Sequence, residues 1–180
     1  EEELILSAHE QILKLYPSSL LIIVPRHPER FDKVAALCKK RGFNLERVSD
    51  SRQASKAKQV LLVDSLGELL VYYAVSDVAF VGGSLLPCGG HNVLEPASLA
   101  IPVITGMNGQ NFREINALLV DNGAQLRVTD ETELAKKVSL LFSDEKLRQK
   151  MGENGKQVVE QNKGTTERIL TLIRERLPLE

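Results

Sequence analysis

The hydrophobic positions of this chain fall into short apolar runs separated by stretches with helical periodicity. The run Leu20–Val24 is unbroken, rich in β-branched residues and bounded by Pro17 and Pro25, which is typical of a strand buried on both faces. Similar runs predict further strands, the last two weaker, at Val60–Val63, Val78–Val81, Pro102–Thr105, Asn44–Val48 and Gln125–Val128. Helical patterns occupy Glu3–Tyr16, Glu29–Arg41, Glu68–Ala74, Val93–Ala100, Phe112–Asn122, Glu131–Phe142, Glu145–Gln161 and Thr165–Arg176.

Strands that alternate with helices at this spacing predict βαβ units, and therefore an α/β fold with a Rossmann-like parallel sheet covered by helices on both faces. The length of 180 residues, without an internal repeat or a low-complexity linker, predicts a single domain over residues 1–180. Ligands of such sheets bind beyond the carboxyl ends of the strands. Four loops there are candidates for a site: Pro25–Arg30, Asp64–Leu69, Gly82–Glu95 and Gly106–Arg113.

Charge is distributed unevenly along the chain, although the net charge is only −1. Between residues 59 and 112 there is no Lys or Arg, yet this segment holds seven of the 12 glycines, which favours a sheet core with loops that approach a ligand closely. Residues 26–58 are basic but include only two aromatic residues, Phe31 and Phe43. Because single-stranded nucleic acid is usually bound by stacking as well as charge, we expect no nucleic-acid partner.

The segment that follows the Val78–Val81 run contains the pairs Gly82–Gly83 and Gly89–Gly90 and then enters a predicted helix. Glycines let backbone N–H groups approach an anion, and a helix N-terminus adds a favourable dipole. Asn92 is a good N-cap, and Glu95, three residues later, completes a capping box. Glu95 could also accept hydrogen bonds from sugar hydroxyls, so the segment predicts a site for a phosphate with an adjacent ribose. Capping and turn formation alone are the competing explanation.

Two other loops contribute candidate ligands. Arg26 lies between Pro25 and Pro28, in a stiff turn that lowers the entropy cost of holding a guanidinium against a phosphate or carboxylate. Ser65 and Glu68 form a second possible capping box, in which an intervening glycine would allow close approach of a base or sugar.

Several other kinds of chemistry have no motif in this sequence. The first strand is not followed by Gly-x-Gly-x-x-Gly, and there is no Gly-x-x-x-x-Gly-Lys-Ser/Thr loop. No His, Cys and acidic residues have metal-ligand spacing, and no Gly-x-Ser-x-Gly marks a nucleophile. The two cysteines, Cys38 and Cys88, cannot form a disulfide framework by themselves. The apolar runs are shorter than the ~18 residues of a membrane span. We therefore expect no metal, no cofactor and no catalytic residue within this chain.

Three blocks of sequence resemble a known family. They are Pro25-Arg-His-Pro-Glu-Arg30, Leu66-Gly-Glu-Leu69 and Phe80-Val-Gly-Gly-Ser-Leu, the last continued by Gly89-Gly-His-Asn-Val-Leu-Glu-Pro-Ala97. Their order and spacing resemble the C-terminal half of bacterial 3-deoxy-D-manno-octulosonic acid (Kdo) transferases. Two departures are Val93, where the family often has proline, and Asn108, where it has histidine.

The resemblance implies a glycosyltransferase of the two-domain GT-B architecture, in which this chain would bind the donor CMP-Kdo. A preceding N-terminal domain would carry the catalytic carboxylate, bind the lipid A precursor that accepts Kdo, and anchor the protein to the cytoplasmic face of the inner membrane. By matched positions, the implied donor-binding residues are Pro25, Arg26, Leu66, Gly67, Glu68, Gly83, Ser84, Gly90, His91, Asn92, Val93, Leu94 and Glu95.

Two alternatives remain compatible with the sequence. One is a GT-B relative that uses a UDP-sugar, either a transferase or a 2-epimerase. The other is an α/β nucleotide-binding module without catalysis.

Overall fold

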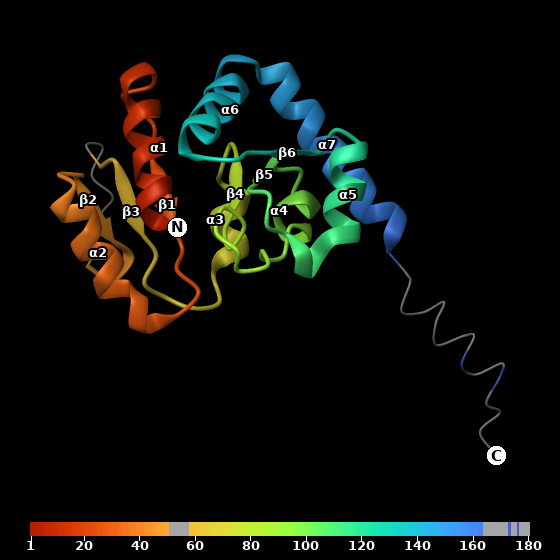
Figure 1. Ribbon diagram of the computed structural model, residues 1–180, viewed down its shortest axis with the longest axis horizontal. Coiled ribbons are helices and arrows are strands. Elements are labelled where there is room, and N and C mark those ends of the chain that lie inside the picture. The colour runs from red at the N-terminus through yellow and green to blue at the C-terminus, as the bar shows by residue number, and fades with distance from the viewer. Residues whose placement is uncertain (51–57, 164–172, 174–175, 177–180) are drawn as a thin grey trace.

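The computed structural model describes residues 1–50, 58–163, 173 and 176 of the chain (Figure 1). All six predicted strands are present, each with three residues: β1 (Leu21–Ile23), β2 (Leu45–Arg47), β3 (Val60–Leu62), β4 (Ala79–Val81), β5 (Val103–Thr105) and β6 (Gln125–Arg127). The helices are α1 (Glu2–Leu15), α2 (Phe31–Lys40), α3 (Leu69–Ala74), α4 (Leu94–Ser98), α5 (Arg113–Asp121), α6 (Glu131–Ser143) and α7 (Glu145–Asn162). Three 3₁₀ turns complete the set: η1 (Pro28–Arg30), η2 (Val48–Asp50) and η3 (Gln110–Phe112). Nearly all of the predicted helix Thr165–Arg176 lies outside the described residues.

Every described strand is parallel to its neighbours, but the strands form two sheets instead of one continuous ladder. The first sheet has the order β2-β3-β1 and the second β4-β5-β6. The registers are regular, with Ile22 opposite Leu61 in the first sheet and Ile104 opposite Leu126 in the second. The predicted parallel α/β fold is confirmed, and the division between β1 and β4 is a feature that the pattern of apolar runs did not indicate.

Strand β5 shows why the apolar runs are continuous. All three of its residues are buried, and successive side chains face opposite sides of the sheet. Val103 packs in a core with residues of α4, α5 and α7, whereas Ile104 packs in a core with residues of α1, α6 and α7. Helices therefore cover both faces of the second sheet.

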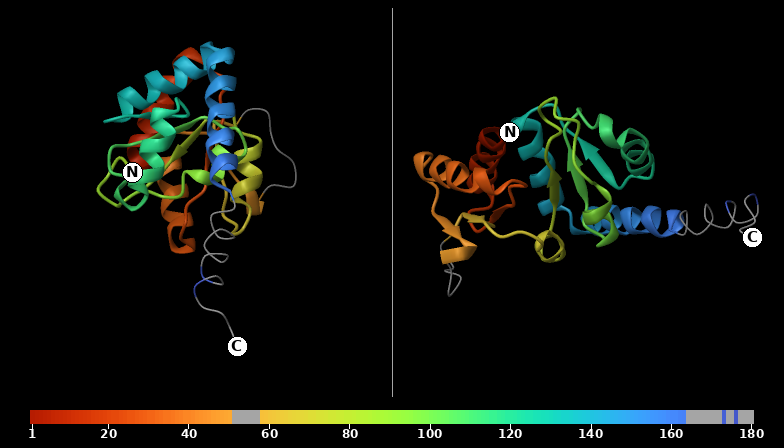
Figure 2. Two further views of the ribbon diagram at one scale, coloured as in Figure 1. Left: turned by 90° about the vertical axis from the view of Figure 1, so that its right-hand side faces the viewer. Right: turned by 90° about the horizontal axis from the view of Figure 1, so that it is seen from below.

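Helix α1 joins the two halves of the molecule. Leu6 belongs to the core of the first sheet, together with residues of α2, while Ala8 and Ile12 belong to a core of the second sheet. In Figure 2, α1 lies between the two sheets, which are arranged side by side. Because no strand pair joins β1 to β4, side chains of α1 supply much of the connection between the sheets.

Candidate functional site

The candidate site lies at the edge of the molecule where the parallel strands end. The loops after β1, β3, β4 and β5 leave this edge, and the helices α2, α3, α4 and α5 follow them. Parallel strands deliver their carboxyl ends to the same side, so residues far apart in sequence can meet there.

The loop after β4 folds back on itself through its glycines. Gly83, Gly89 and Gly90 have φ of 70°, 92° and 79°, in the left-handed region that favours glycine. The N–H of Gly90 donates to the carbonyl of Gly83 at 2.7 Å. A Cβ on Gly83 would lie 3.2 Å from Nε2 of His91. The structure therefore brings Gly83, Gly90 and His91 together.

Ser84 joins this loop to the loop after β5. Its buried hydroxyl donates to the carbonyl of Val81 at 2.7 Å and accepts from the N–H of Gly106 at 2.8 Å. The N–H of Asn108 donates to the carbonyl of Ser84 at 2.8 Å, and Asn108 Nδ2 lies 3.2 Å from the carbonyl oxygens of Ser84 and Leu85. The side chains of Ser84 and Asn108 thus maintain the loop. The bonds between the two loops cross more than twenty residues, so no local pattern could have found them.

The start of α4 differs from the predicted capping box. The helix begins at Leu94 with Val93 at the N-cap position, instead of Asn92. Asn92 Oδ1 accepts from the N–H of Leu94 at 3.0 Å, and Asn92 Nδ2 donates to Glu95 Oε1 at 3.0 Å. Asn92 therefore bonds to Glu95 through its side chain, and no hydrogen bond from the backbone N–H of Asn92 to the Glu95 carboxylate is present. The five-residue α4 also carries less aligned dipole than the longer helix that was predicted.

The side chains around α4 have distinct surroundings. His91 is exposed and Val93 is buried in the core, so Val93 can offer a ligand only its backbone. Tyr73 of α3, which sequence reasoning did not identify, lies near Glu95. Burial, together with the Glu95 carboxylate, raises the pKa of Tyr73 to about 12. Tyr73 therefore stays protonated near neutral pH.

The loop after β3 has one anchored end and one open end. The Asp64 carboxylate accepts from Arg47 Nε at 2.8 Å, from the Ser49 N–H at 2.9 Å and from the Ser49 hydroxyl at 2.5 Å. Burial acts to raise the pKa of Asp64, but the hydrogen bonds from Ser49 and Arg47 outweigh it and lower the pKa. Asp64 thus fixes the point at which this loop leaves the sheet.

Beyond Ser65 this loop becomes exposed. Leu66, Gly67 and Glu68 all lie at the surface, and Gly67 has a φ of 90°. The predicted capping box at Ser65 is wrong, because α3 begins at Leu69 and Glu68 itself occupies the N-cap position. The Ser65 hydroxyl instead donates to Glu68 Oε2 at 2.5 Å. The apolar and acidic side chains of this loop are available to a ligand.

The loop after β1 presents a free cation. Pro25 is buried and Arg26 is exposed, and within the described residues Arg26 has no hydrogen bond or ion pair. The structure brings the loops after β4 and β5 into direct contact, and α3 packs against α4. Among the described residues, no hydrogen bond or ion pair joins Arg26 to those loops.

Within the described residues, no three His, Cys, Asp or Glu side chains gather closely enough to hold a metal ion. Of the described helices, none combines the length and apolar character needed to cross a membrane.

The chain resembles known proteins over most of its length. The family model "Glycosyl transferases group 1" matches residues 3–158. A 3-deoxy-D-manno-octulosonic acid transferase of Haemophilus influenzae is 43% identical over 175 residues, which are 97% of this chain and 41% of that protein. The Aquifex aeolicus protein of the same name is 39% identical over 149 residues, or 81% of this chain and 40% of that protein. The chain thus spans about two fifths of the length of these relatives.

Solved structures agree with the fold. The C-terminal CMP-Kdo binding domain of WaaA from Acinetobacter baumannii has a TM-score of 0.83 and 35% identity, covering 88% of this chain and 82% of that one. The C-terminal domain of the group 1 glycosyl transferase LpcC from Francisella tularensis is 19% identical with a TM-score of 0.56, which supports the fold alone. The chain therefore belongs to the glycosyl transferases group 1 family and is a homologue of the 3-deoxy-D-manno-octulosonic acid transferases.

Proposed function

We propose that this chain is the donor-binding domain of a Kdo transferase and that it binds CMP-Kdo at the carboxyl edge of its sheets. The observation that carries the proposal is the likeness to the CMP-Kdo binding domain of WaaA, at 35% identity and a TM-score of 0.83. The meeting of the predicted donor loops at one edge supports it.

Each loop has a role in this proposal that follows from its chemistry. The exposed guanidinium of Arg26 pairs with the phosphate of CMP, since a planar fork of donors suits phosphate oxygens. The backbone N–H groups of residues 91–93 are offered to the same phosphate, since those of Gly90 and Leu94 already donate to Gly83 and Asn92. Glu95 accepts hydrogen bonds from the ribose hydroxyls, with Asn92 orienting its carboxylate.

The open loop after β3 supplies the remaining contacts. Leu66 gives an apolar surface for the base, Gly67 permits close approach, and Glu68 accepts hydrogen bonds. These three residues are exposed, whereas the preceding Asp64 is held by three hydrogen bonds. The nucleotide would thus bind to the exposed part of a loop whose first residue, Asp64, is held in place by hydrogen bonds.

The reaction that this site serves is transfer of Kdo to a hydroxyl of a lipid A precursor, with inversion at the anomeric carbon. The acceptor oxygen forms the new bond, the bond to the CMP phosphate oxygen breaks, and a general base takes the acceptor proton. Arg26 and the nearby N–H groups stabilise the charge on the departing CMP. The described residues of the site offer no evident base. We therefore assign the base, the acceptor site and contact with the cytoplasmic face of the inner membrane to the part of the relatives that lies outside this chain, and expect the chain alone to be inactive.

A titration of the isotope-labelled chain with CMP, UMP and UDP, followed through backbone amide shifts, tests the proposal. CMP should shift the amides of residues 66–68 and 90–95 and bind more tightly than UMP or UDP. A preference for UDP would replace the Kdo donor with a UDP-sugar. The absence of binding to all three nucleotides would overturn the donor-binding role.

A matched pair of variants assigns the ribose contact. Glu95→Ala should weaken CMP binding about tenfold, as expected for loss of hydrogen bonds to a charged acceptor. Glu114→Ala removes a carboxylate from the first turn of the next helix, α5, and should leave the affinity unchanged. Equal effects of the two substitutions would contradict the role of Glu95.

A further inference from the structure

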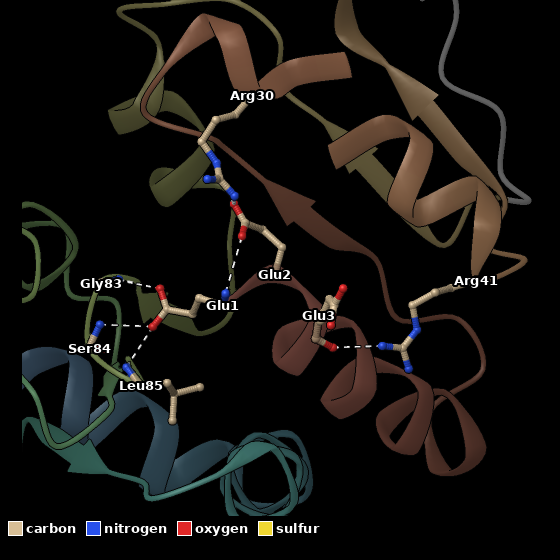
Figure 3. Close-up of polar contacts among 8 residues, drawn as sticks. All are labelled: Glu1, Glu2, Glu3, Arg30, Arg41, Gly83, Ser84 and Leu85. Carbon is tan, nitrogen blue, oxygen red and sulfur yellow. Dashed lines mark hydrogen bonds and ion pairs between the residues drawn. The ribbon is translucent and has the colours of Figure 1, made fainter. Parts of the chain in front are cut away.

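The carboxylate of Glu1 occupies a cradle of three consecutive backbone N–H groups in the loop after β4. Glu1 Oε2 accepts from Gly83 at 2.5 Å, and Oε1 accepts from Ser84 at 3.0 Å and from Leu85 at 2.7 Å (Figure 3). Gly83 has a φ of 70°, and a left-handed residue in a turn makes successive N–H groups converge on an anion. We call residues 83–85 the carboxylate nest.

The first turn of α1 reaches both halves of the molecule from this position. Beside Glu1, the Glu2 carboxylate accepts from Arg30 Nη2 at 2.8 Å and from Nε at 3.2 Å. Arg41 Nη1 donates to the carbonyl of Glu3 at 2.9 Å. Arg30 and Arg41 flank α2 in the first half, whereas the carboxylate nest belongs to the second. Glu1 is therefore a direct polar link across the division between β1 and β4.

The position of Glu1 can influence the candidate donor site directly, because Gly83, which binds Glu1, also lies beside Gly90 and His91. The carbonyl of Gly83 accepts the N–H of Gly90, and the space beside Gly83 is bounded by His91 and Gly90. A shift of Gly83 would therefore move the backbone to which we assign phosphate binding. Without an anion, the three N–H groups of the nest would lose their bonds, and buried N–H groups without partners are costly.

We propose that Glu1 is a positioning residue: its carboxylate fills the carboxylate nest and sets the loop after β4 in the conformation that receives the donor. The part of this inference that concerns the donor rests on the proposed function, whereas the anion-binding character of the nest does not. In the competing arrangement, the nest itself receives an anion of the donor and Glu1 blocks it.

Glu1→Ala separates these arrangements, with Glu3→Ala as the matched control. Glu3 lies in the same first turn and its side chain is exposed, so its removal deletes the same charge without emptying the nest. All variants carry the same N-terminal extension, and thermal unfolding identifies those that fold. Glu1→Gln, which keeps one acceptor oxygen and the side-chain length, provides a second test if Glu1→Ala does not fold.

The first readout needs no nucleotide. In Glu1→Ala the amide resonances of residues 83–85 should move, and added acetate should return them towards their original positions, while Glu3→Ala should show neither effect. A Glu1→Ala chain whose nest amides do not respond to acetate would overturn the nest as an anion site. For Glu1→Gln we expect a smaller shift of the same amides; their failure to move would also overturn the proposal.

The second readout is the affinity for CMP. We expect Glu1→Ala to weaken binding about tenfold, within the range of coupling between adjoining sites, and acetate to restore it. Tighter binding in Glu1→Ala, with acetate acting as a competitor, would show instead that the nest receives the donor. An unchanged affinity would overturn the positioning role. If the unsubstituted chain binds no CMP, the proposed function fails, and the acetate response still decides whether the nest binds anions.

Discussion

The loops after β4 and β1 lie at the same edge of the molecule and differ in how their polar groups are satisfied. In the loop after β4, the N–H groups of Gly83, Ser84 and Leu85 bind Glu1, and the Ser84 hydroxyl bonds to Val81 and Gly106. In the loop after β1, Arg26 is exposed and makes no hydrogen bond to any described residue.

This difference indicates a division of labour. A loop whose groups are already bonded presents its remaining donors in a fixed arrangement and loses little entropy when a ligand binds. An arginine without partners must be ordered by the ligand, which costs about 1–2 kcal/mol of side-chain entropy. Its side chain can, however, adjust its position to the phosphate of the ligand. We infer that the loop after β4 binds the donor through rigidly placed backbone groups, whereas the loop after β1 binds it through a mobile positive charge.

The largest effect should come from overpacking the contact between the loops after β4 and β5. A Cβ on Gly106 would lie 2.1 Å from the backbone oxygen of Ser84, so Gly106→Ala should lower the free energy of unfolding by about 3 kcal/mol. Gly155→Ala in α7 is the control, because its Cβ would make only ordinary contacts at 3.4 Å or more and would improve helix propensity. Urea denaturation measures both; equal stabilities would show that the loop is not rigid.

Substitution in the loop after β3 should have an effect on stability between those for the loops after β4 and β1. Asp64→Asn replaces a carboxylate that is only 3% exposed and should cost about 2 kcal/mol, typical of hydrogen bonds to a charged group. Asp32→Asn is the control, since Asp32 contacts the same Arg47 but is 90% exposed, and exposed pairs contribute little. Chemical denaturation at neutral pH compares the two.

The pKa of Asp64 gives this comparison a pH dependence. Its pKa is lowered in the folded state, so its contribution is complete above the unfolded-state pKa, about 3.9. That contribution is lost as the pH falls through the lower folded-state value. Asp64→Asn should therefore reduce the acid dependence of stability below about pH 4, and an unchanged acid slope would contradict the role of this carboxylate.

A substitution in the loop after β1 should lower the affinity for the ligand without changing the stability of the fold. Arg26→Ala should weaken CMP binding about tenfold while the free energy of unfolding changes by less than about 0.5 kcal/mol. Lys40→Ala, at the far end of α2, removes a cation from the opposite edge and should change neither quantity. Calorimetry and denaturation measure the pair; a large loss of stability in Arg26→Ala would remove the contrast between the loops.

The smallest effect should come from the exposed bond between Ser65 and Glu68. Ser65→Ala removes this bond, and we expect less than about 0.5 kcal/mol in unfolding because solvent replaces exposed partners. Denaturation in urea detects a larger change, which would mean that the end of this loop is also anchored.

Much of the fold could be predicted from local patterns. The six apolar runs became strands, and the helical patterns within residues 1–163 became helices, because burial on two faces and a period of 3.6 both leave marks on neighbouring residues. Element ends were less predictable: α4 begins at Leu94 and α3 at Leu69, although the capping boxes suggested earlier starts. Ser65 and Asn92 each donate to the carboxylate three residues later, and Asn92 also accepts from the N–H of Leu94.

The sequence by itself determined the order of the elements, the parallel α/β class and the loops in which glycine, arginine and acidic residues gather. Only the tertiary structure decided that the strands divide into two sheets, that Ser84 bonds to Gly106, and that Glu1 occupies the nest at residues 83–85. The physical reason is distance along the chain. Periodicity reports which face of an element is buried, whereas a hydrogen bond between residues more than twenty or eighty positions apart forms only when the packed core brings them together.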